Sequence, residues 1–580
     1  MNNIFKGIAA LALAGSITSC SGDYLELPPE SEVNDTQIAE SIEGSRAALY
    51  GLCQAMYIGT YGSGWIRISN GEGYFRTVYG DSGTPDFFDP WLYGYQTETQ
   101  LWELMTTDGN IGNTFAWGYC YNLIHQANVI LRDIDNVPAE ESEVHFVKAQ
   151  ALTMRAHAYI HLMQVYGPRF EDANNGDELC YVLRLEPGTG DLPLSSYKDC
   201  MGNIYEDLET AISLFEGSDV KRKYGFEPDI NVARGLLSRA ALMNHDWNTA
   251  QTMAHDARAS YPIMTAEQYK AGFAEHNDEW MWYNLPDKTT NGYNSWGASF
   301  SCNGAYATAY NWSSAGNISW DFYKMLYAKN PNDIRLELFW TPDKANKYVN
   351  FKIKDSDFWN PSKINPEFFF MYGPNEEMSA AISLFISHNT PEGFEGGYSI
   401  DTSLTDAQAK NAVARKKWYT DNASIAKKKT DGRVQFGAQI KFWSSLADLG
   451  ASEIPFMRAG ELILNEAEAA MEAGDETTAQ KCLVDLNKNR IPGYSCTLTG
   501  DALRQEIRLT RRIELWGEGD TWFAMKRWNI DVERRIWEKG NPNSNNMMTS
   551  YKGSYPASYN KGWRFMIPRQ ETNYNNLINK

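Results

Sequence analysis

Small residues at helical spacing are the feature that most constrains how this chain can fold. Ala250, Ala254 and Ala257 lie on one face of a helix predicted over residues 246–260, and Pro262 follows it. Asp246 is a suitable N-cap because its carboxylate accepts hydrogen bonds from free backbone N–H groups. Small side chains let another helix approach closely, and one is predicted just before, over residues 229–245. The chain therefore contains at least one closely packed helix pair.

The spacing of these small residues matches the second helix of a tetratricopeptide repeat. The first helix departs from that repeat, because Arg234, Ser238 and Ala241 stand where the repeat has Trp, Gly and Tyr. We therefore expect divergent tetratricopeptide-like helix pairs, not a regular array.

Apolar periodicity predicts helices elsewhere, so the expected fold class is all-α. One spans residues 142–167, where Gly167-Pro168 would end it, and another carries apolar residues from 204 to 215 and stops at Gly217. A later pair is predicted near residues 456–486. Its first helix would carry Phe456, Ala459, Ile463, Ala467 and Ala470, and its second Ala479, Leu483 and Leu486.

Helical periodicity fails between about residues 269 and 440, where Gly, Asn, Ser, Pro and aromatic residues dominate. Long irregular loops in a compact protein usually carry function. About half of the aromatic rings in this stretch are expected to be core. Trp296 and Trp312 lie in Asn/Ser/Gly-rich loops and are the better candidates for stacking against sugar rings. The aromatic members are Trp280, Trp282, Tyr283, Tyr293, Trp296, Tyr306, Tyr310, Trp312 and Trp320.

The N-terminus has the features of a bacterial lipoprotein leader. Lys6 precedes a short apolar run, small residues follow, and Cys20 stands directly after the expected cleavage point. We predict a signal peptide over residues 1–19, lipidation of Cys20 and an extended tether over residues 20–32. The alternative is an ordinary secretory peptide with a chance cysteine.

Charge and cysteine usage exclude several function classes. The formal net charge of −20 argues against nucleic acid as a partner, because such binding needs a basic surface. Seven cysteines remain besides Cys20, with no CxxC pair, which argues against a thioredoxin-type or cysteine-rich zinc site. We expect most of them to be buried small hydrophobes.

Two motifs resemble parts of a catalytic site and of a metal site, but we interpret both as structural. Residues 80–83 read Gly-Asp-Ser-Gly, as around a protease serine, but a helical chain does not supply the rest of that site. His157 and His161 stand four residues apart and can ligate zinc, but Ala158 occupies the position of a general-base glutamate. We expect both histidines to be polar members of a packed helix, and we predict no catalytic residue, metal or cofactor.

Motifs in the C-terminal third resemble the SusD/RagB family. They cover residues 458–469, 486–490 and 511–528, the last containing Leu515-Trp516-Gly517-Glu518-Gly519, with a closing motif at residues 567–576. Residues 155–168 and 205–208 are similar to the family's helical N-terminal half. The resemblance extends over nearly the whole mature chain.

The resemblance implies a SusD-like fold over residues 33–580. Its parts would be a helical half at 33–268, a loop-rich aromatic insert at 269–440 and a signature region at 441–580. It also implies an outer-membrane lipoprotein facing the cell exterior, which captures a glycan and delivers it to a SusC-like TonB-dependent transporter. Arg76, Trp91, Tyr93 and Trp312 resemble glycan-binding positions of the family. A peptide-binding member of the family and a surface glycoside hydrolase are the alternatives.

Overall fold

The structure is a computed structural model of the 580-residue chain. It describes residues 40–57, 71–88, 99, 101–273, 275–284, 317–339, 368–370, 432–434, 439, 441–442, 453–536, 545, 547 and 551–578.

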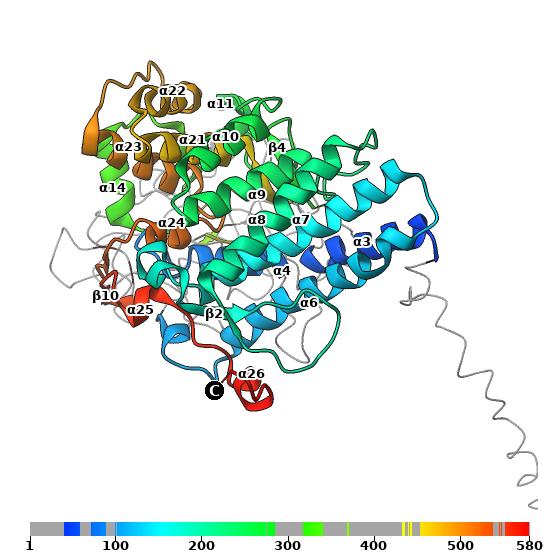
Figure 1. Ribbon diagram of the computed structural model, residues 1–580. Helices are drawn as coiled ribbons and strands as arrows, with labels where there is room; N and C mark the ends of the chain where they lie inside the picture. The colour runs from blue at the N-terminus through cyan, green and yellow to red at the C-terminus, as the bar shows by residue number, and fades with distance from the viewer. Residues whose placement is uncertain are drawn as a thin grey trace, which may run out of the picture.

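Helices form most of the described chain, as expected for the all-α class (Figure 1). The α-helices are α3 (Ile42–Tyr57), α4 (Gly71–Tyr74), α6 (Ile111–Asp133), α7 (Glu141–Tyr166), α8 (Tyr197–Glu216), α9 (Ile230–Met243), α10 (Trp247–Arg258), α11 (Ala266–Ala271), α14 (Trp320–Lys329), α21 (Ala459–Glu472), α22 (Glu476–Asn487), α23 (Gly500–Glu514), α24 (Thr521–Arg527), α25 (Asn560–Trp563) and α26 (Arg569–Tyr574). A π-helical turn, η3 (Phe75–Tyr79), continues α4, and 3-10 turns are η4 (Glu103–Met105), η5 (Ile134–Asn136), η6 (Phe170–Asp172), η7 (Asn174–Gly176) and η8 (Ile334–Leu338).

The long helices stack one against the next. From α6 to α10 each helix packs on its successor, and the stack continues through α21 and α22 to α23. In Figure 1 it runs from the blue and cyan helices at the right to the orange helices at the upper left. Helix α10 packs directly on α21 although residues 259–458 separate the two helices in the sequence.

The predicted helix pair 229–260 is confirmed as α9 and α10. Asp229 caps α9 by accepting from the backbone N–H groups of Asn231 and Val232, and Asp246 caps α10 by accepting from that of Thr249. Ala250, Ala254 and Ala257 are fully buried, in keeping with a close helix contact. The helices predicted at 142–167 and 204–217 are also confirmed, as α7 and α8, and Gly167 caps the C-terminus of α7.

In the part of the chain that the structure describes, strands form five short antiparallel ribbons of two strands each. The pairs are β1 (Phe87–Phe88) with β5 (Asn317–Ile318), β2 (Leu179–Val182) with β3 (Leu194–Ser196), β4 (Trp280–Tyr283) with β8 (Pro455–Arg458), β6 (Phe368–Phe370) with β7 (Gly432–Val434), and β9 (Val532–Arg534) with β10 (Gly553–Tyr555).

The β4–β8 ribbon corrects the sequence interpretation at Phe456. That residue was assigned to a helix, but it lies in β8, and α21 begins only at Ala459. Pairing with β4, far away in the sequence, draws residues 455–458 into a strand. The same ribbon places Trp280 and Trp282 in the core, with 3% and 0% of their surface exposed. Two rings of the aromatic-rich stretch are therefore structural, in agreement with the expectation that many would be.

The cysteines agree with the expectation of buried small side chains. Of the six in the described residues, all are unpaired thiols, and every one but the partly exposed Cys496 is buried. They are Cys53, Cys120, Cys180, Cys200, Cys482 and Cys496.

Candidate functional site

Most residues singled out from the sequence lie outside the described residues. This holds for the lipidation candidate Cys20 and for the glycan-binding candidates Trp91, Tyr93, Trp296 and Trp312. Of the glycan-binding candidates, Arg76 lies within the described residues, and its role in glycan binding remains a prediction.

Arg76 lies in the π-helical turn η3, where the chain crosses the C-terminal signature motif. Its guanidinium Nη1 donates a hydrogen bond to the backbone carbonyl of Pro455. The crossing is tight, because a Cβ on Gly519 would stand 2.3 Å from Cβ of Arg76, and one on Gly80 would stand 2.2 Å from the Gly519 carbonyl oxygen. Gly519 also has a φ of +77°, which favours glycine. In the Gly517–Gly519 part of the signature, Gly519 therefore allows the chain to pack directly against the backbone of Arg76 and Gly80.

A small internal cavity of about 40 Å³ lies beside this crossing. Arg76, Arg239, Arg511 and Arg527 contribute four guanidinium groups to its wall. Four carboxylates also line it, from Glu72, Glu461, Glu518 and Asp520. The space is large enough for water but far too small for a sugar ring, so it is not a glycan site.

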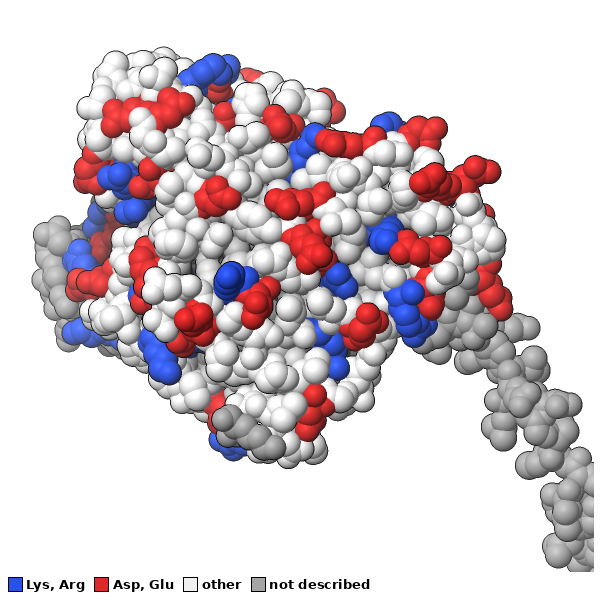
Figure 2. Space-filling model, viewed as in Figure 1, with Lys and Arg blue, Asp and Glu red and all other residues white. Residues whose placement is uncertain are grey.

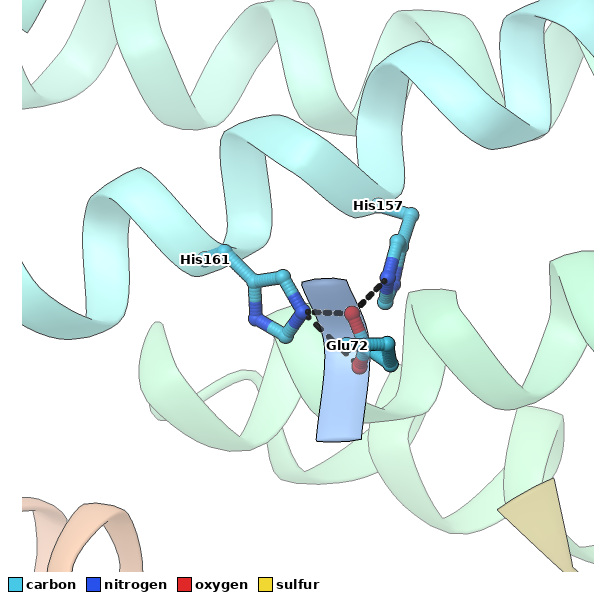
Figure 3. Close-up of side chains that lie close together, drawn as sticks. All are labelled: Glu72, His157 and His161. Atoms are coloured by element: carbon cyan, nitrogen blue, oxygen red, sulfur yellow. Dashed lines mark hydrogen bonds and ion pairs between the residues drawn. The ribbon is translucent and has the colours of Figure 1, made fainter. Parts of the chain in front are cut away.

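Glu72 connects two helices at one end of this cavity. Figure 3 shows His157 and His161 of α7 pointing at the Glu72 carboxylate from α4. The His157 Nε2 atom lies 3.1 Å from Glu72 Oε2, and the His161 Nε2 atom lies 2.9 Å from the same oxygen. The Tyr119 hydroxyl donates to this oxygen as well, at 3.1 Å. Both histidines are buried in a packed helix, as the sequence analysis expects.

The Gly-Asp-Ser-Gly motif is part of the core. The Ser82 hydroxyl donates to the Thr77 carbonyl, and Ser82 is 4% exposed. The Asp81 carboxylate accepts a hydrogen bond from the Gly519 N–H at 2.7 Å, and burial raises the pKa of Asp81 to about 8. Ser82 is therefore inaccessible, and among the described residues it has no histidine contact of the kind that a nucleophile requires.

The best exposed aromatic feature in the described residues is a row along α14. The rings of Trp320 and Tyr323 are nearly parallel, at 9° with centroids 5.3 Å apart, and Tyr323 and Tyr327 are at 16° and 6.3 Å. Tyr327 is 55% exposed, and Trp320 and Tyr323 are partly exposed.

Polar groups stand next to this aromatic row. Asp321, between the first two rings in sequence, pairs with Arg535 at 3.2 Å, and the Arg535 side chain is 51% exposed. Lys324 places its ammonium group 5.1 Å from the Trp320 ring centroid. Aromatic faces with adjacent hydrogen-bonding groups are the combination that binds sugar rings. Trp320 is one of the aromatic residues noted in the sequence, but the row is not among the sequence predictions, although its i, i+3, i+7 spacing is typical of one face of a helix.

The charged side chains on the surface agree with the net negative charge of the sequence. Figure 2 shows acidic side chains scattered over the visible face, with basic ones singly between them and no continuous basic patch. Within the described part of the chain, no helix combines the length and apolarity that crossing a bilayer requires.

Together these features define a class, that of mainly helical binding proteins. Residues 262–579 match the family model described as SusD family, and residues 64–242 match a second model described as starch-binding associating with outer membrane. A SusD-like protein of Bacteroides ovatus is 25% identical over 276 residues. That alignment covers 47% of this chain and 44% of the relative, so less than half of the relative's length is matched.

Solved structures share the fold over nearly their whole length. A SusD-like carbohydrate binding protein of Bacteroides vulgatus is 19% identical with a TM-score of 0.64, covering 93% of this chain and 97% of that one. A putative sugar binding protein of the same species is 21% identical with a TM-score of 0.65, covering 93% and 98%. At these identities the likeness concerns the fold alone.

The chain belongs to the SusD family, a family of non-catalytic binding proteins, and it has the SusD-like fold.

Proposed function

We propose that this protein is a lipid-anchored protein of the outer membrane that binds a glycan at the cell surface and delivers it to a SusC-like TonB-dependent transporter. Family membership supports the binding role, and the second family description, starch-binding associating with outer membrane, supports the ligand class and location. Two relatives of the same fold are described as carbohydrate or sugar binding. The predicted lipidation at Cys20 supports the anchor and the outward orientation.

The observation that carries the glycan assignment is the aromatic row Trp320–Tyr323–Tyr327. It follows closely in sequence on the predicted arc residue Trp312, and α14 lies at the left edge of Figure 1, opposite α3 at the right. We therefore propose that the row contributes to the glycan-binding surface, while Arg76, Trp91, Tyr93, Trp296 and Trp312 remain contacts predicted from the sequence. Asp321 and Arg535 would supply hydrogen bonds to sugar hydroxyl groups.

The test is affinity electrophoresis of the purified protein against a panel of soluble polysaccharides, followed by titration calorimetry with the best ligand. Trp320→Ala and Tyr327→Ala should each weaken binding roughly fivefold, because one aromatic stacking contact is worth about 1 kcal/mol. Trp312→Ala with Trp296→Ala should weaken it further. Tyr574→Ala is the matched control, since Tyr574 is 82% exposed but lies in α26, at the bottom of Figure 1.

Distinct results would contradict each part of the proposal. Unchanged affinity in all the tryptophan and tyrosine variants would place the ligand elsewhere. Binding of peptides with no binding of any polysaccharide would favour the peptide-binding alternative, and new reducing ends after incubation would identify a hydrolase. For the anchor, Cys20→Ala should release the folded protein from the membrane fraction, and its retention there in a strain without the transporter would refute lipidation.

A further inference from the structure

We propose that Glu72, His157 and His161 bind a divalent transition-metal ion, with zinc as the best match. One nitrogen of each imidazole and one carboxylate oxygen lie within 4.8 Å of one another, and all three residues are buried. In Figure 3 both rings converge on the carboxylate. Two imidazoles with one carboxylate are typical zinc ligands, whereas calcium and magnesium prefer oxygen ligands alone.

The spacing of the ligand atoms suits such an ion. Zinc bonds of about 2.0–2.2 Å in a tetrahedral site place neighbouring ligand atoms about 3.3 Å apart. The observed separations from Glu72 are 3.1 Å for His157 and 2.9 Å for His161, so each of these two differs from the ideal by a few tenths of an ångström. The two imidazole nitrogens lie within 4.8 Å of each other. The two histidines stand one helical turn apart on α7, which lets both rings face the same point.

The hydrogen bonds of His161 leave a lone pair facing Glu72. Its Nδ1 atom lies 3.0 Å from the Gln164 side-chain oxygen, an acceptor, so Nδ1 carries the proton. In a neutral ring Nε2 then presents a lone pair to the carboxylate, which is also an acceptor. A cation between them resolves this conflict. In the metal-free alternatives His161 donates to Glu72, either as an imidazolium ion with both nitrogens protonated or with the Gln164 amide reversed.

Glu72 is the carboxylate of the cavity that remains available to a cation. The other three have basic partners: Glu461 pairs with Arg239 at 2.5 Å, Asp520 with Arg511 at 2.7 Å, and Glu518 with Arg458 and Lys441. Among the described residues, the hydrogen-bonding partners of Glu72 are His157, His161 and Tyr119, while the guanidinium groups of Arg76 and Arg239 act on it electrostatically without forming a close ion pair. An ion entering this cavity therefore finds its negative ligand at Glu72.

The surroundings supply what a three-ligand zinc site needs. Glu72 and His161 line the 40 Å³ cavity, which has room for a water molecule as a fourth ligand. Gln164 would orient His161 through Nδ1, and Tyr119 would orient Glu72, as outer partners do in zinc sites. His157 Nδ1 is buried with no hydrogen-bond partner in the described part of the chain, and coordination at Nε2 would offset that cost.

The bound ion would join α4 to α7 and so fix the π-helical turn that follows α4. No metal is expected from the sequence, because Ala158 follows His157 where zinc proteases have a glutamate. The third ligand, Glu72, is 85 positions before His157 and is not visible from helical spacing.

The test uses tag-free, full-length protein treated with a chelator and then dialysed against zinc. Elemental analysis should find one zinc per chain, and cobalt in its place should give the visible bands of a four-coordinate site. His161→Gln and Glu72→Gln should each weaken zinc binding about 100-fold or more and abolish the cobalt bands. His255→Gln is the matched control, because His255 also contacts a glutamate, Glu466 at 3.0 Å, but is 60% exposed.

Circular dichroism of the metal-free variants shows whether they fold. Substoichiometric zinc in the wild type, or stoichiometric zinc that survives both substitutions, would overturn the proposal and favour the metal-free alternatives. A loss of zinc in the His255 variant equal to that in the His161 variant would also overturn it, because the binding would then be at surface histidines. The outcome is independent of glycan binding, which is measured separately.

Discussion

Two regions of this protein bury a carboxylate in opposite ways. Glu514, at the end of α23, is fully buried and receives three guanidinium groups, from Arg335, Arg458 and Arg490, at 3.0–3.2 Å. Glu72 is equally buried but faces imidazoles and a phenol. The first arrangement is saturated with fixed positive charge and ties distant segments together. The second has two imidazoles, which can bind a metal ion, in place of guanidinium groups, which cannot.

The difference extends to neighbouring carboxylates in the C-terminal region. Glu468 of α21 accepts from Arg527 at 2.8 Å and from the Trp528 indole at 2.9 Å, and Arg511 lies 3.7 Å away. Residues 511–528, which look like a family signature in the sequence, therefore contain one of the buried acids as well as partners of the other. Glu514 lies in this segment, and Arg511, Arg527 and Trp528 of the segment contact Glu468. We call this arrangement, in which arginine side chains bind the buried carboxylates Glu514 and Glu468, the clamp. Among its described contacts, Glu72 has no such arginine partner at ion-pair distance.

The largest expected effect is that of Glu514→Gln. It would leave three buried guanidinium groups short of a counter-charge, which typically costs about 3–5 kcal/mol. Chemical denaturation should measure this loss in the free energy of unfolding. Asp501→Asn serves as the control, because Asp501 pairs with Arg504 but its side chain is 76% exposed, and such pairs contribute below about 1 kcal/mol. A loss as small as the control's would show that the Arg-rich arrangement is not a clamp.

Acid should weaken the clamp through Glu468. Burial opposes ionisation, but Arg527 lowers the pKa of Glu468 to about 2, against an ordinary value of 4.5. A lowered carboxyl pKa contributes stability above the unfolded value, and this contribution is lost as pH falls from 4.5 to about 2. The difference corresponds to about 3 kcal/mol. Unfolding free energies measured from pH 5 to pH 2 should fall less steeply in Glu468→Gln, and parallel curves would contradict the assignment.

A packing variant supplies a reference for these charge effects. Ala254→Trp would force a large ring into the buried face of α10, which packs on α9 and α21. Overpacking costs about 1–3 kcal/mol, so its effect should fall below that of Glu514→Gln. The thermal midpoint measures it, with Gln251→Ala on the partly exposed side of α10 as the control. Wild-type melting would mean that Ala254 does not lie at a close contact.

The sequence predicts the helix stack well and the charged clusters poorly, for a physical reason. Helices α7 to α10 follow from apolar periodicity and from caps such as Asp229 and Asp246, which are local signals. Phe456 was misassigned because its strand exists only through pairing with β4. The partners of Glu514 and Glu72 come from other elements, and spacing along one helix shows neither. The aromatic row of α14 was readable from spacing, but its exposure depends on the tertiary structure.

The smallest effect, and the sharpest test of the difference between the regions, is expected for Tyr119→Phe. The hydroxyl donates to Glu72 at 3.1 Å, and its removal leaves the carboxylate with contacts to both imidazoles. Because a neutral donor is lost and the acceptor stays partly satisfied, the metal-free protein should lose only about 1 kcal/mol of unfolding free energy. Denaturation of chelator-treated wild type and variant measures this directly. A loss approaching that of Glu514→Gln would mean that Glu72 depends on Tyr119 as Glu514 depends on its arginines, and the two regions would no longer differ in kind.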